Sequence, residues 1–413
     1  MKICLLAYKF YESSPAMMQF ASSFAEQGDD IDVICLGREN QPEFARCKGV
    51  NVYRLQPRVT NEKDRLSYLW RTAKFFFLAT IFLSRKHWER QYDLIHIQNV
   101  PDFLVFAAFV PRVLGVPVIL DVHDIVPEFY ASKFTSNRSS VAFRLLVVVE
   151  RLSAAFASHV IAPTHLWQER LVSRSVKSQK CTTIRYLPDP RMFYPRPKEQ
   201  SSERFLIVYP GTLNRHQGVD VAIKALAKIL PAIPQAEFHI YGEGPAKPYL
   251  AELARSLGVA HKVKLAEMLP KEQVIDLMAQ ADVAVEPKLV ESRFANETCS
   301  VKMLEFMALG IPVVASRTRV HAFYYDDRMI KFYEADREED VASAILLLAG
   351  DEVLRRSLVA NALKYIEANN WLKERERYRE LVNRLQATRK RPRNLQPRRS
   401  GEETQITGEV RTT

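Results

Sequence analysis

Residues 296–316 decide the fold, and they read NETCSVKMLEFMALGIPVVAS. A polar segment leads into an apolar helical pattern that ends at Gly310, and a continuous apolar run typical of a buried parallel strand follows. Two carboxylates, Glu297 and Glu305, flank the start of the helix. A free helix N-terminus binds phosphate, and a carboxylate beside it accepts hydrogen bonds from sugar hydroxyls. The stretch therefore predicts a site for a ligand with both groups, such as a nucleotide-sugar.

The spacing of the two glutamates leaves a second interpretation open. Eight residues rise about 12 Å in a helix, so the carboxylates can reach both ends of a folded nucleotide-sugar. The amides of Cys299, Ser300 and Val301 would then face its diphosphate. Alternatively, Glu305 is a solvated helix residue and Glu297 a loop charge. The position directly before a buried strand favours the first interpretation.

Length and composition indicate two globular domains. The chain has 413 residues, 47% of them hydrophobic and 26% charged. Its five cysteines are widely spaced without a Cys-x-x-Cys pair, so we expect neither a disulfide framework nor a structural zinc, but a reducing, cytoplasmic setting. The N-terminus lacks the pattern of a signal peptide. The longest helical apolar run, 75–83, is shorter than the ~20 residues of a transmembrane helix.

Short apolar runs alternate with helical patterns in both halves of the chain, which predicts two doubly wound parallel sheets. The first half has strand patterns at 2–8, 31–36, 94–98, 116–122, 158–162 and 182–186. The second half has them at 205–210, 236–241, 262–265, 282–286, 311–315 and 330–333, with helices near 217–230, 246–257, 271–280 and 299–309. A proline-rich segment without periodicity separates the halves, and we place the domain linker there, at 188–204.

The C-terminal region continues as helix from 338 to about 385 and includes Trp371 and Tyr378. Its apolar side chains need a partner, and we predict that a helix at 369–387 packs back on the first domain. Residues 388–413 carry seven basic and three acidic side chains with almost no aliphatic ones, so we expect a disordered basic tail.

Two glycine segments follow predicted strands in the second half. Gly211 begins a loop that opens a helix, where backbone can approach a phosphate, and Arg215 in that loop is the natural counter-charge for a diphosphate. An ordinary strand-to-helix turn fits the same spacing. Gly242 begins a second loop without the third glycine of a dinucleotide fingerprint, so we interpret it as a tight turn near a base. A nicotinamide enzyme is not expected.

Polar residues stand beside two predicted strands of the first half. His123 and Asp124 follow the apolar run 116–122, at the edge where ligands collect in an open α/β sheet. His123 can exchange a hydrogen bond with a sugar hydroxyl, although a structural histidine fits as well. Asp30 and Asp32 have Asp-x-Asp spacing but enter an early strand, so no metal site is expected.

Residues 54–90 form the most basic stretch before the tail, with nine basic and three acidic side chains around Trp70, Trp88 and a run of phenylalanines. The charges fit peripheral contact with anionic lipid on the cytoplasmic face of a membrane. For the apolar face we favour a helix whose phenylalanines fill the first core. Nucleic acid binding is not expected, because the basic residues flank an apolar run instead of alternating with exposed aromatics.

Together these segments resemble glycosyltransferase family 4, which comprises retaining glycosyltransferases of GT-B fold. The Glu297-x7-Glu305 spacing and the strand after it match the family signature, and the resemblance covers about residues 1–385. Other segments resemble the family in its own order, namely 92–96, 121–124, 163–164, 209–213 and 241–245. The resemblance implies two Rossmann-like domains facing across a cleft, with an acceptor-side domain at 1–187 and a nucleotide-sugar donor domain at 205–368.

The resemblance also implies roles for single residues. Glu297 would contact the donor hexose, and Glu305 the ribose hydroxyls. His123 would stand near the transferred sugar, which makes His123 and Glu297 the predicted catalytic residues. The predicted donor-binding residues are Gly211, Thr212, Arg215, Gly242, Cys299, Ser300, Val301, Lys302 and Glu305. The family retains the anomeric configuration, uses the departing phosphate oxygen as base and needs no metal or other cofactor, since positive groups stabilise the leaving diphosphate.

The phosphate loop departs from the family pattern. Where many members have Arg and then Lys-Gly, this chain has Thr212 and Gln217 before Gly218, so Arg215 or His216 would have to substitute. The glycine-rich acceptor loop near the N-terminus is also absent.

We expect a hexose-type sugar to move from a nucleotide diphosphate to a hydroxyl of a saccharide or lipid-linked acceptor, in polysaccharide or glycoconjugate synthesis. The alternatives are a non-catalytic donor-binding partner subunit of another transferase and a sugar-nucleotide epimerase of GT-B fold.

Overall fold

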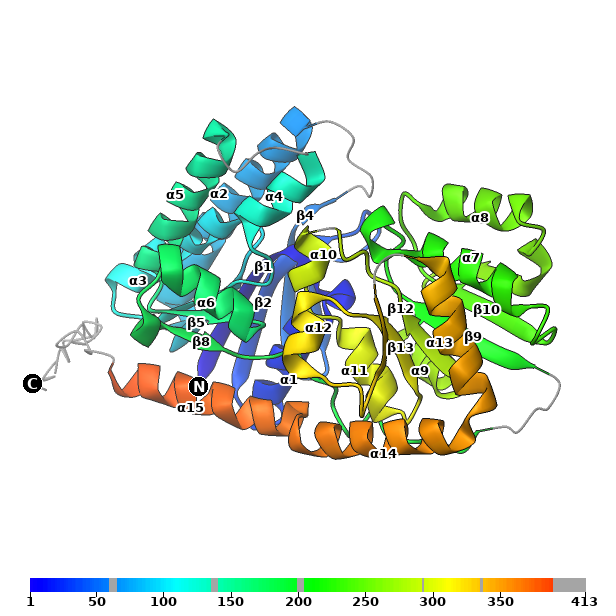
Figure 1. Ribbon diagram of the computed structural model, residues 1–413. Coiled ribbons are helices and arrows are strands. Elements are labelled where there is room, and N and C mark those ends of the chain that lie inside the picture. The colour runs from blue at the N-terminus through cyan, green and yellow to red at the C-terminus, as the bar shows by residue number, and fades with distance from the viewer. Residues whose placement is uncertain (59–64, 135–139, 199–203, 292, 335–336, 389–413) are drawn as a thin grey trace, which may run out of the picture.

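The computed structural model describes residues 1–413 except 59–64, 135–139, 199–203, 292, 335–336 and 389–413. Figure 1 shows two α/β domains beside each other, with the C-terminal helices running along both. All twelve strand patterns predicted from the sequence are strands of the two sheets. The prediction of two doubly wound domains is therefore confirmed.

The first domain contains an eight-stranded sheet with the order β3-β4-β2-β1-β5-β6-β7-β8. Its strands are β1 Lys2–Phe10, β2 Asp30–Gly37, β3 Phe44–Cys47, β4 Val50–Pro57, β5 Leu94–Gln98, β6 Val118–Asp121, β7 His159–Ala162 and β8 Cys181–Thr183. Every pairing is parallel except that of β3 with β4. The strand order reverses between β1 and β5, and ligands collect at the carboxyl ends of strands at such a switch point.

The sequence prediction missed the hairpin of β3 and β4. Strand β4 alternates buried and half-buried residues, whereas the prediction looked for continuously buried runs. The turn between the strands is Lys48-Gly49, and both residues have positive φ angles, 49° and 84°. Two such residues form the tight turns that join antiparallel strands.

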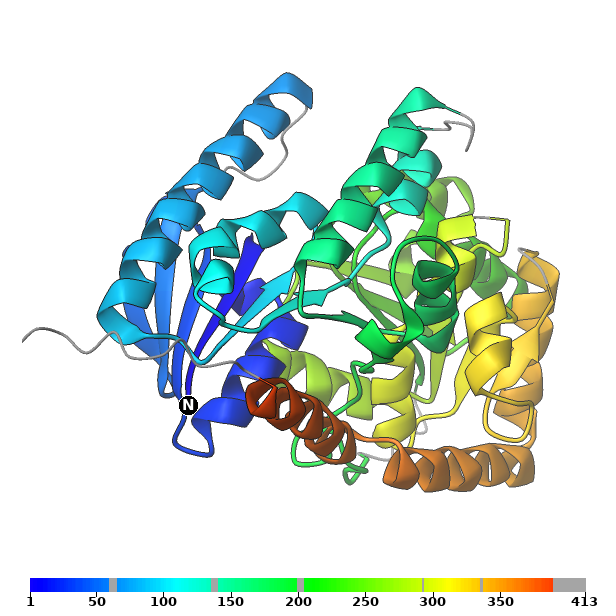
Figure 2. The same ribbon diagram turned by 90° about the vertical axis from the view of Figure 1, so that its left-hand side faces the viewer.

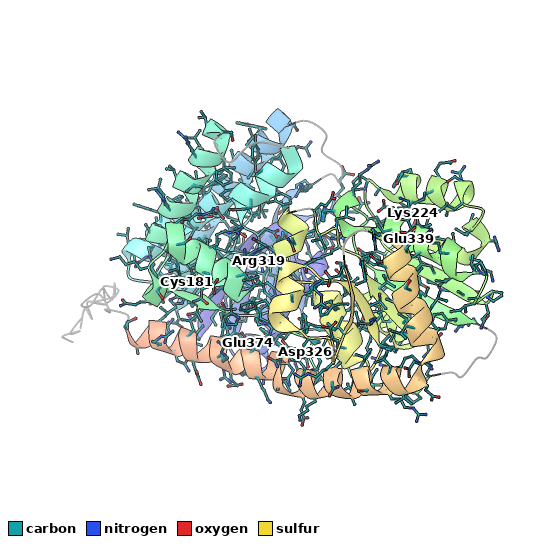
Figure 3. The ribbon with its side chains drawn as sticks, in the orientation of Figure 1. Cys181, Lys224, Arg319, Asp326, Glu339 and Glu374 are labelled. Carbon is teal, nitrogen blue, oxygen red and sulfur yellow. The ribbon has the colours of Figure 1, made fainter. Side chains whose placement is uncertain are left out.

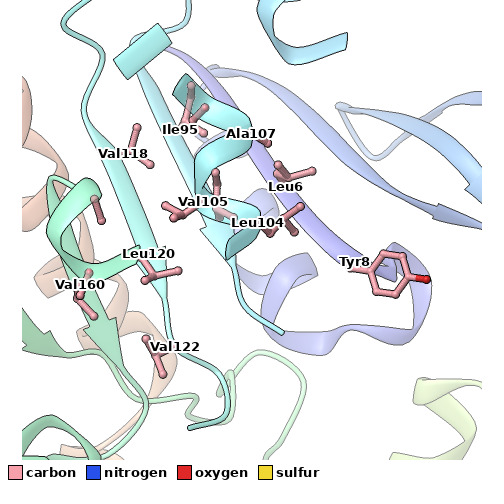
Figure 4. Close-up of a cluster of buried hydrophobic side chains, with 14 of the residues drawn as sticks. Leu6, Tyr8, Ile95, Leu104, Val105, Ala107, Val118, Leu120, Val122 and Val160 are labelled. Atoms are coloured by element: carbon pink, nitrogen blue, oxygen red, sulfur yellow. The ribbon is translucent and has the colours of Figure 1, made fainter. Parts of the chain in front are cut away.

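Helices cover both faces of the first sheet because its central strands are apolar on both sides. One layer contains α2 Arg65–Arg90, the 3-10 helix η2 Asp102–Ala108, α3 Phe109–Val113, α5 Val141–Phe156 and α6 His165–Arg174. Figure 4 shows Leu104 and Val105 of η2 packed over Leu6, Ile95 and Val118 of the sheet. The other face is covered by α1 Pro15–Ala25 and the C-terminal helix α15 Trp371–Ala387. Helix α4 Val126–Phe134 follows β6 and contacts α5 and α10.

The second domain contains a six-stranded parallel sheet with the order β11-β10-β9-β12-β13-β14. Its strands are β9 Phe205–Pro210, β10 Ala236–Tyr241, β11 Val263–Ala266, β12 Val283–Glu286, β13 Val313–Ser316 and β14 Lys331–Tyr333. Its helices are α7 Val219–Ile229, α8 Lys247–Ser256, α9 Lys271–Ala279, α10 Arg293–Glu297, α11 Val301–Ala308, α12 Arg319–Tyr324, α13 Glu338–Gly350 and α14 Glu352–Ala368. The switch point lies between β9 and β12.

The C-terminal helical pattern is divided into α13, α14 and α15. Asp351 and Asn370 separate them, because each side chain accepts a hydrogen bond from the first turn of the next helix and caps it. Helix α15 returns to the first domain as predicted: Trp371 and Tyr378 pack on Phe20 of α1, with ring centroids 5.5 and 4.6 Å apart. Figures 1 and 2 show α15 lying beside the N-terminal strand and α1.

Two further predictions concern the C-terminal tail and the absence of a transmembrane helix. The predicted disordered tail lies outside the described residues except for Thr388. Within the described part of the chain, no helix has both the length and the apolar character required to cross a bilayer.

Candidate functional site

A buried ion pair stands at the carboxyl end of β12, beside the switch point of the second sheet. Lys302 Nζ, in the first turn of α11, lies 2.8 Å from Glu286 Oε2 and 3.3 Å from Tyr209 Oη. The same ammonium lies 4.4 Å from the centre of the Tyr209 ring. Burial acts to lower the pKa of Lys302, but the Glu286 carboxylate outweighs it and raises that pKa above its usual range. Lys302 is therefore a fixed cation.

A second lysine is buried next to this pair. Lys288 follows β12 by two residues, is 3% exposed and donates a hydrogen bond of 2.5 Å to the carbonyl oxygen of Thr298. Burial lowers the pKa of Lys288 to about 8, although Glu286 acts to raise it. Two buried ammonium groups, those of Lys288 and Lys302, thus surround the buried carboxylate of Glu286. We call this group of residues the wall of the second domain. Such an excess of buried positive charge attracts an anion.

Helix α11 begins at the same place. Ser300 is its N-cap residue and is 4% exposed, yet its hydroxyl does not cap the helix, and Ser300 Oγ has no hydrogen-bond partner within the described part of the chain. A buried hydroxyl without a partner beside the first amides of a helix is a feature of a phosphate site. Cys299, Ser300, Val301 and Lys302, all predicted donor-binding residues, meet here.

Glu305 lies one turn further along α11. Burial raises the pKa of its carboxyl to about 7, with Lys271 and Lys302 opposing the shift. At neutral pH, Glu305 is consequently divided between its protonated and ionised forms. The ionised form can accept hydrogen bonds from two vicinal hydroxyls.

Glu297 has different surroundings from those predicted. It ends the short helix α10 instead of standing in a loop, and its carboxylate binds Arg170 of α6 through both oxygens, at 2.6 and 2.5 Å. Arg319 of α12, labelled in Figure 3, adds a contact of 3.1 Å. Because Arg170 belongs to the first domain, Glu297 joins the two domains. A donor hexose would have to displace or share these arginines to contact Glu297.

The backbones of the two predicted glycines, Gly211 and Gly242, pack against each other beside the Lys302 side chain. A Cβ atom on Gly242 would stand 1.8 Å from the carbonyl oxygen of Gly211, and one on Gly211 would stand 3.0 Å from Lys302 Cε. Gly211 also has a φ of 149°, which disfavours other residues. The glycines therefore let the ends of β9 and β10 close against the ion pair.

The predicted phosphate loop contributes no buried cation of its own. Thr212 is exposed, and the exposed side chain of Arg215 stacks on the ring of Tyr249 at 4.8 Å. Gln217, where the family pattern has lysine, accepts a hydrogen bond of 3.3 Å from Tyr209 Oη, the same oxygen that lies beside Lys302. Gln217 of the loop and Lys302 of α11 therefore contact the same hydroxyl.

The first domain supplies the opposite wall. His123 follows β6, and its backbone N–H donates to Asn99 Oδ1 at 2.8 Å, which holds the loop after β6 against the end of β5. Burial lowers the pKa of His123 to about 3, so the imidazole is neutral at physiological pH, and its Nδ1 has no hydrogen-bond partner among the described residues. Burial raises the pKa of the neighbouring Asp124 to about 6, with Lys9 and Lys288 opposing.

A cavity of about 120 Å³ lies between residues of the first domain and the start of α11, although Glu286, Lys288 and Lys302 are not among the residues that line it. The residues that line it are His123, Asp124, Pro163, Thr164, Trp167, Arg185, Tyr186, Thr298, Cys299 and Val301. It brings the predicted His123 together with the start of α11 but does not include Glu297. Its volume is below the roughly 300–1,000 Å³ of a usual ligand site.

Sequence reasoning missed Glu286, Lys288, Asn99 and Arg185. Glu286 and Lys288 stand at the end of an apolar strand pattern. Because the same pattern identified His123, it could also have identified these two residues. Asn99 and Arg185 gave no such signal, because their roles depend on partners in other elements. No group of three or more His, Cys, Asp or Glu side chains that could hold a metal ion occurs in the part of the chain that the structure describes.

The arrangement of two doubly wound domains with a site between them is the GT-B fold, and comparisons with solved structures agree. Sucrose-phosphate synthase from Thermosynechococcus elongatus superposes with a TM-score of 0.78 at 18% identity, over 94% of this chain and 99% of that one. HepE from Anabaena, solved in complex with UDP-glucose, has a TM-score of 0.69 at 18% identity, over 93% of this chain and all of that one. At 18% sequence identity, these similarities show a shared fold and nothing about the substrate.

Family models identify the class of enzyme. Residues 13–186 match the glycosyl transferase 4-like domain, and residues 192–365 match glycosyl transferases group 1. An uncharacterised glycosyltransferase from Methanocaldococcus jannaschii is 24% identical over 72% of this chain and 74% of its own length. The alpha-D-kanosaminyltransferase of Streptomyces kanamyceticus is 23% identical over 62% of this chain and 68% of its own. The chain belongs to glycosyltransferase family 4.

Proposed function

We propose that this glycosyltransferase moves a hexose-type sugar from a nucleotide diphosphate to a hydroxyl of a saccharide or lipid-linked acceptor, with retention of anomeric configuration. The observation that carries the proposal is the buried Lys302–Glu286 pair at the start of α11, next to Lys288 and the unpartnered Ser300 hydroxyl. These groups fit a diphosphate. HepE and a trehalose-6-phosphate protein of similar fold were solved with UDP-glucose and UDP-2-fluoro glucose, which supports a nucleotide-sugar donor.

The charges around α11 suggest how the reaction proceeds. The bond between the anomeric carbon and the phosphate oxygen breaks, and the acceptor oxygen forms its bond to the same face of that carbon. The acceptor proton passes to the departing phosphate oxygen, so the nucleotide diphosphate leaves as it is protonated. Lys302 and Lys288 stabilise the negative charge that develops on the leaving group. Because these ammonium groups supply that charge, we propose that transfer needs no metal, and activity should persist in EDTA.

Residues on both walls would orient the sugar. Neutral His123 is suited to exchange a hydrogen bond with a hydroxyl of the transferred sugar, since its Nδ1 is buried and unpartnered among the described residues. Glu305 in its ionised form would accept from the ribose hydroxyls. Glu297 would reach the hexose after its contacts with Arg170 and Arg319 open.

A donor panel tests the proposal. Nucleotide release would be measured from UDP-, GDP- and ADP-sugars with lipid-linked and free saccharide acceptors, and the anomeric configuration of the product determined by NMR. We expect turnover with one donor class and a retained anomer. Donor binding without turnover would favour the partner subunit, and conversion of the donor sugar without transfer would favour the epimerase. Glu305→Ala should weaken donor binding about 10- to 100-fold, as expected for a charged hydrogen bond of about 1.5–3 kcal/mol.

We also propose peripheral contact with an anionic membrane, through one helical layer of the first domain. Figure 2 shows α2 and α5 as two long helices projecting on the same side, with η2 and α3 between them. The buried Phe75 confirms part of the predicted core helix, but Phe77 is 63% exposed. Helices α2, α3 and α5 each carry large exposed apolar side chains. These are Leu69, Trp70, Phe77, Ile81 and Trp88 on α2, Phe109 and Val113 on α3, and Val141, Leu145, Val148 and Leu152 on α5.

The charged residues of this layer match anionic lipid. Lys74, Arg85, Arg144 and Arg151 are exposed on α2 and α5. Among the described residues of the three helices, the exposed carboxylate is Glu89, which is paired with Arg85 and Lys86. An exposed apolar face bordered by basic residues is typical of a helix that lies in the headgroup region.

Vesicle sedimentation tests this contact. We expect binding to vesicles that contain phosphatidylglycerol, weaker binding to pure phosphatidylcholine, and loss of binding in a Trp70→Ser, Ile81→Ser, Leu145→Ser variant. Leu257→Ser and Tyr249→Ser, at exposed positions of the second domain, serve as the matched control. Concentration-dependent dimerisation that the triple change abolishes, without vesicle binding, would instead assign the surface to a second copy of the chain.

A further inference from the structure

Arg185 is a buried cation between the two domains. It follows β8, is 6% exposed, and its backbone N–H donates to Glu374 Oε1 of α15 at 2.9 Å. Its guanidinium forms no ion pair with a carboxylate of the described chain. Arginine keeps its charge at any physiological pH, so it cannot relieve burial by losing a proton.

Neutral groups hold this guanidinium in place. It stacks on the ring of Tyr324 at 4.1 Å, and Nη1 donates to Tyr365 Oη at 3.0 Å and more distantly to Asn369 Oδ1 at 3.4 Å. Nη2 is buried and has no hydrogen-bond partner within the described residues. The contacts come from α12 and α14 of the second domain, so they fix the orientation of Arg185 without neutralising it. An uncompensated buried charge costs several kcal/mol unless an anion accompanies it.

Arg185 also lines the cavity between the two walls. His123, whose Nδ1 is unpartnered among the described residues, lines the same cavity, and so does Cys299 at the start of α11. Arg185 and Lys288 both act on Cys299, where their positive charges oppose the burial that raises the thiol pKa. Arg185 of the first domain and Lys288 of the second thus bring positive charge to the cavity, which the Asp124 carboxyl also lines.

We propose that Arg185 binds an oxyanion of the substrate in this cavity. The planar fork of a guanidinium matches a carboxylate or a phosphate with two parallel hydrogen bonds. Two parts of a substrate can supply that chemistry, namely a carboxylate on the transferred sugar, as in a hexuronic acid, or the diphosphate of the donor. The proposal rests on the proposed function, because it assigns the cavity to the substrate.

The test compares Arg185→Met and Arg185→Lys with the wild-type protein. Arg191→Gln is the matched control, because Arg191 is a half-exposed arginine of the linker that is paired with Asp189 and Glu26. Thermal unfolding and calorimetric titration would be measured with uridine, UDP, UDP-glucose and UDP-glucuronate, and with the GDP analogues. If the sugar supplies the oxyanion, the wild-type protein prefers UDP-glucuronate to UDP-glucose, and Arg185→Met removes this preference, which we expect to be about 10- to 100-fold.

If the diphosphate supplies the oxyanion, Arg185→Met weakens UDP and both UDP-sugars by the same factor and leaves uridine unchanged. In either case Arg185→Lys keeps part of the affinity, and ligand-free Arg185→Met unfolds at a temperature no lower than the wild type, because a costly buried charge is gone. A destabilised Arg185→Met protein with unchanged ligand affinities would overturn the proposal.

Failure of the proposed function is recognised separately. A wild-type protein that releases no nucleotide from any donor contradicts the transferase proposal. Stabilisation of that protein by inorganic pyrophosphate or glucuronate, lost in Arg185→Met and kept in Arg191→Gln, would still support an oxyanion site at Arg185. Absence of such stabilisation together with unchanged nucleotide binding would refute it.

Discussion

The two walls of the cleft are built from the same βα units but carry opposite chemistry. The second domain places Lys288 and Lys302 around Glu286, and strong charges remain there because they are paired or hydrogen-bonded. The first domain places neutral His123 beside Asp124, whose carboxyl pKa is raised by burial to about 6. The carboxyl ends of parallel strands thus define where a site forms, while the residues after each strand define which part of a substrate it can bind.

The largest expected effect follows from removal of Lys302, one of the two buried cations of the second wall. Lys302→Met keeps most of the side-chain volume but leaves Glu286 buried without its partner, which should lower the free energy of unfolding by about 3–5 kcal/mol. Urea denaturation measures the change. The double variant with Glu286→Gln should recover most of this stability without recovering donor affinity, and Lys364→Met, at an exposed position of α14, is the control. Full donor affinity in the double variant would contradict the role of Lys302.

The next effect concerns the first wall. His123→Ala should lower kcat about 10- to 100-fold through the loss of a hydrogen bond to the sugar, with UDP affinity unchanged. Steady-state kinetics and calorimetry separate the two quantities. His261→Ala, at an exposed position of the second domain, should change neither. Equal losses in UDP binding and kcat would show that His123 is structural and that the two walls are not divided as described.

A smaller effect depends on pH. Burial raises the pKa of Glu305 to about 7, and only its ionised form accepts hydrogen bonds from both ribose hydroxyls. Affinity for UDP-glucose should consequently increase as pH rises through 7, by at most about tenfold per pH unit. Titrations at pH 6, 7 and 8 measure it, since the diphosphate of a nucleotide-sugar stays fully charged in this range. Glu305→Gln should flatten the profile, and an unchanged slope in that variant would assign the titration to another group.

The smallest effect concerns the contact that joins the walls. Arg319 is 58% exposed where it meets Glu297, so Arg319→Ala should change the free energy of unfolding by no more than about 1 kcal/mol. Arg170, which is 21% exposed and binds both oxygens, should matter more. Denaturation of the two variants in parallel measures the difference. Equal effects would mean that Glu297 does not depend on its contact with the first domain.

The sequence predicted the fold well because its strands are continuously apolar. Each buried run needs only local pattern to be recognised, as 116–122 and 311–315 illustrate. The sequence prediction missed the hairpin of β3 and β4 because its strands are half exposed and therefore lack a continuous apolar run. The phenylalanine run of α2 was predicted to fill the first core, yet Phe77 is exposed on its outer face, since a helix packed on a sheet buries only one side.

The site was predicted in part for the same reason. Gly211, Gly242 and the start of α11 follow strand ends in the sequence, and the structure brings them together around Lys302. Arg215 was chosen as the counter-charge by its position in the loop, but its side chain lies against Tyr249. The direction of an exposed side chain depends on neighbouring elements, and local pattern carries no information about them.

The sequence by itself determined the two doubly wound sheets, the place where α11 begins beside the strand ends of the second sheet, and the return of α15. Period, turn residues and strand ends are local properties of the chain. Only the tertiary structure decided that Lys302 and Gln217 contact the same Tyr209 hydroxyl, that Glu297 binds Arg170 of the other domain, and that Arg185 is buried without a described carboxylate partner. The Lys302–Tyr209 and Glu297–Arg170 contacts join residues that are 93 and 127 positions apart in the sequence. The burial of a charged side chain, and the electrostatic cost of that burial, arise only when such distant segments come together.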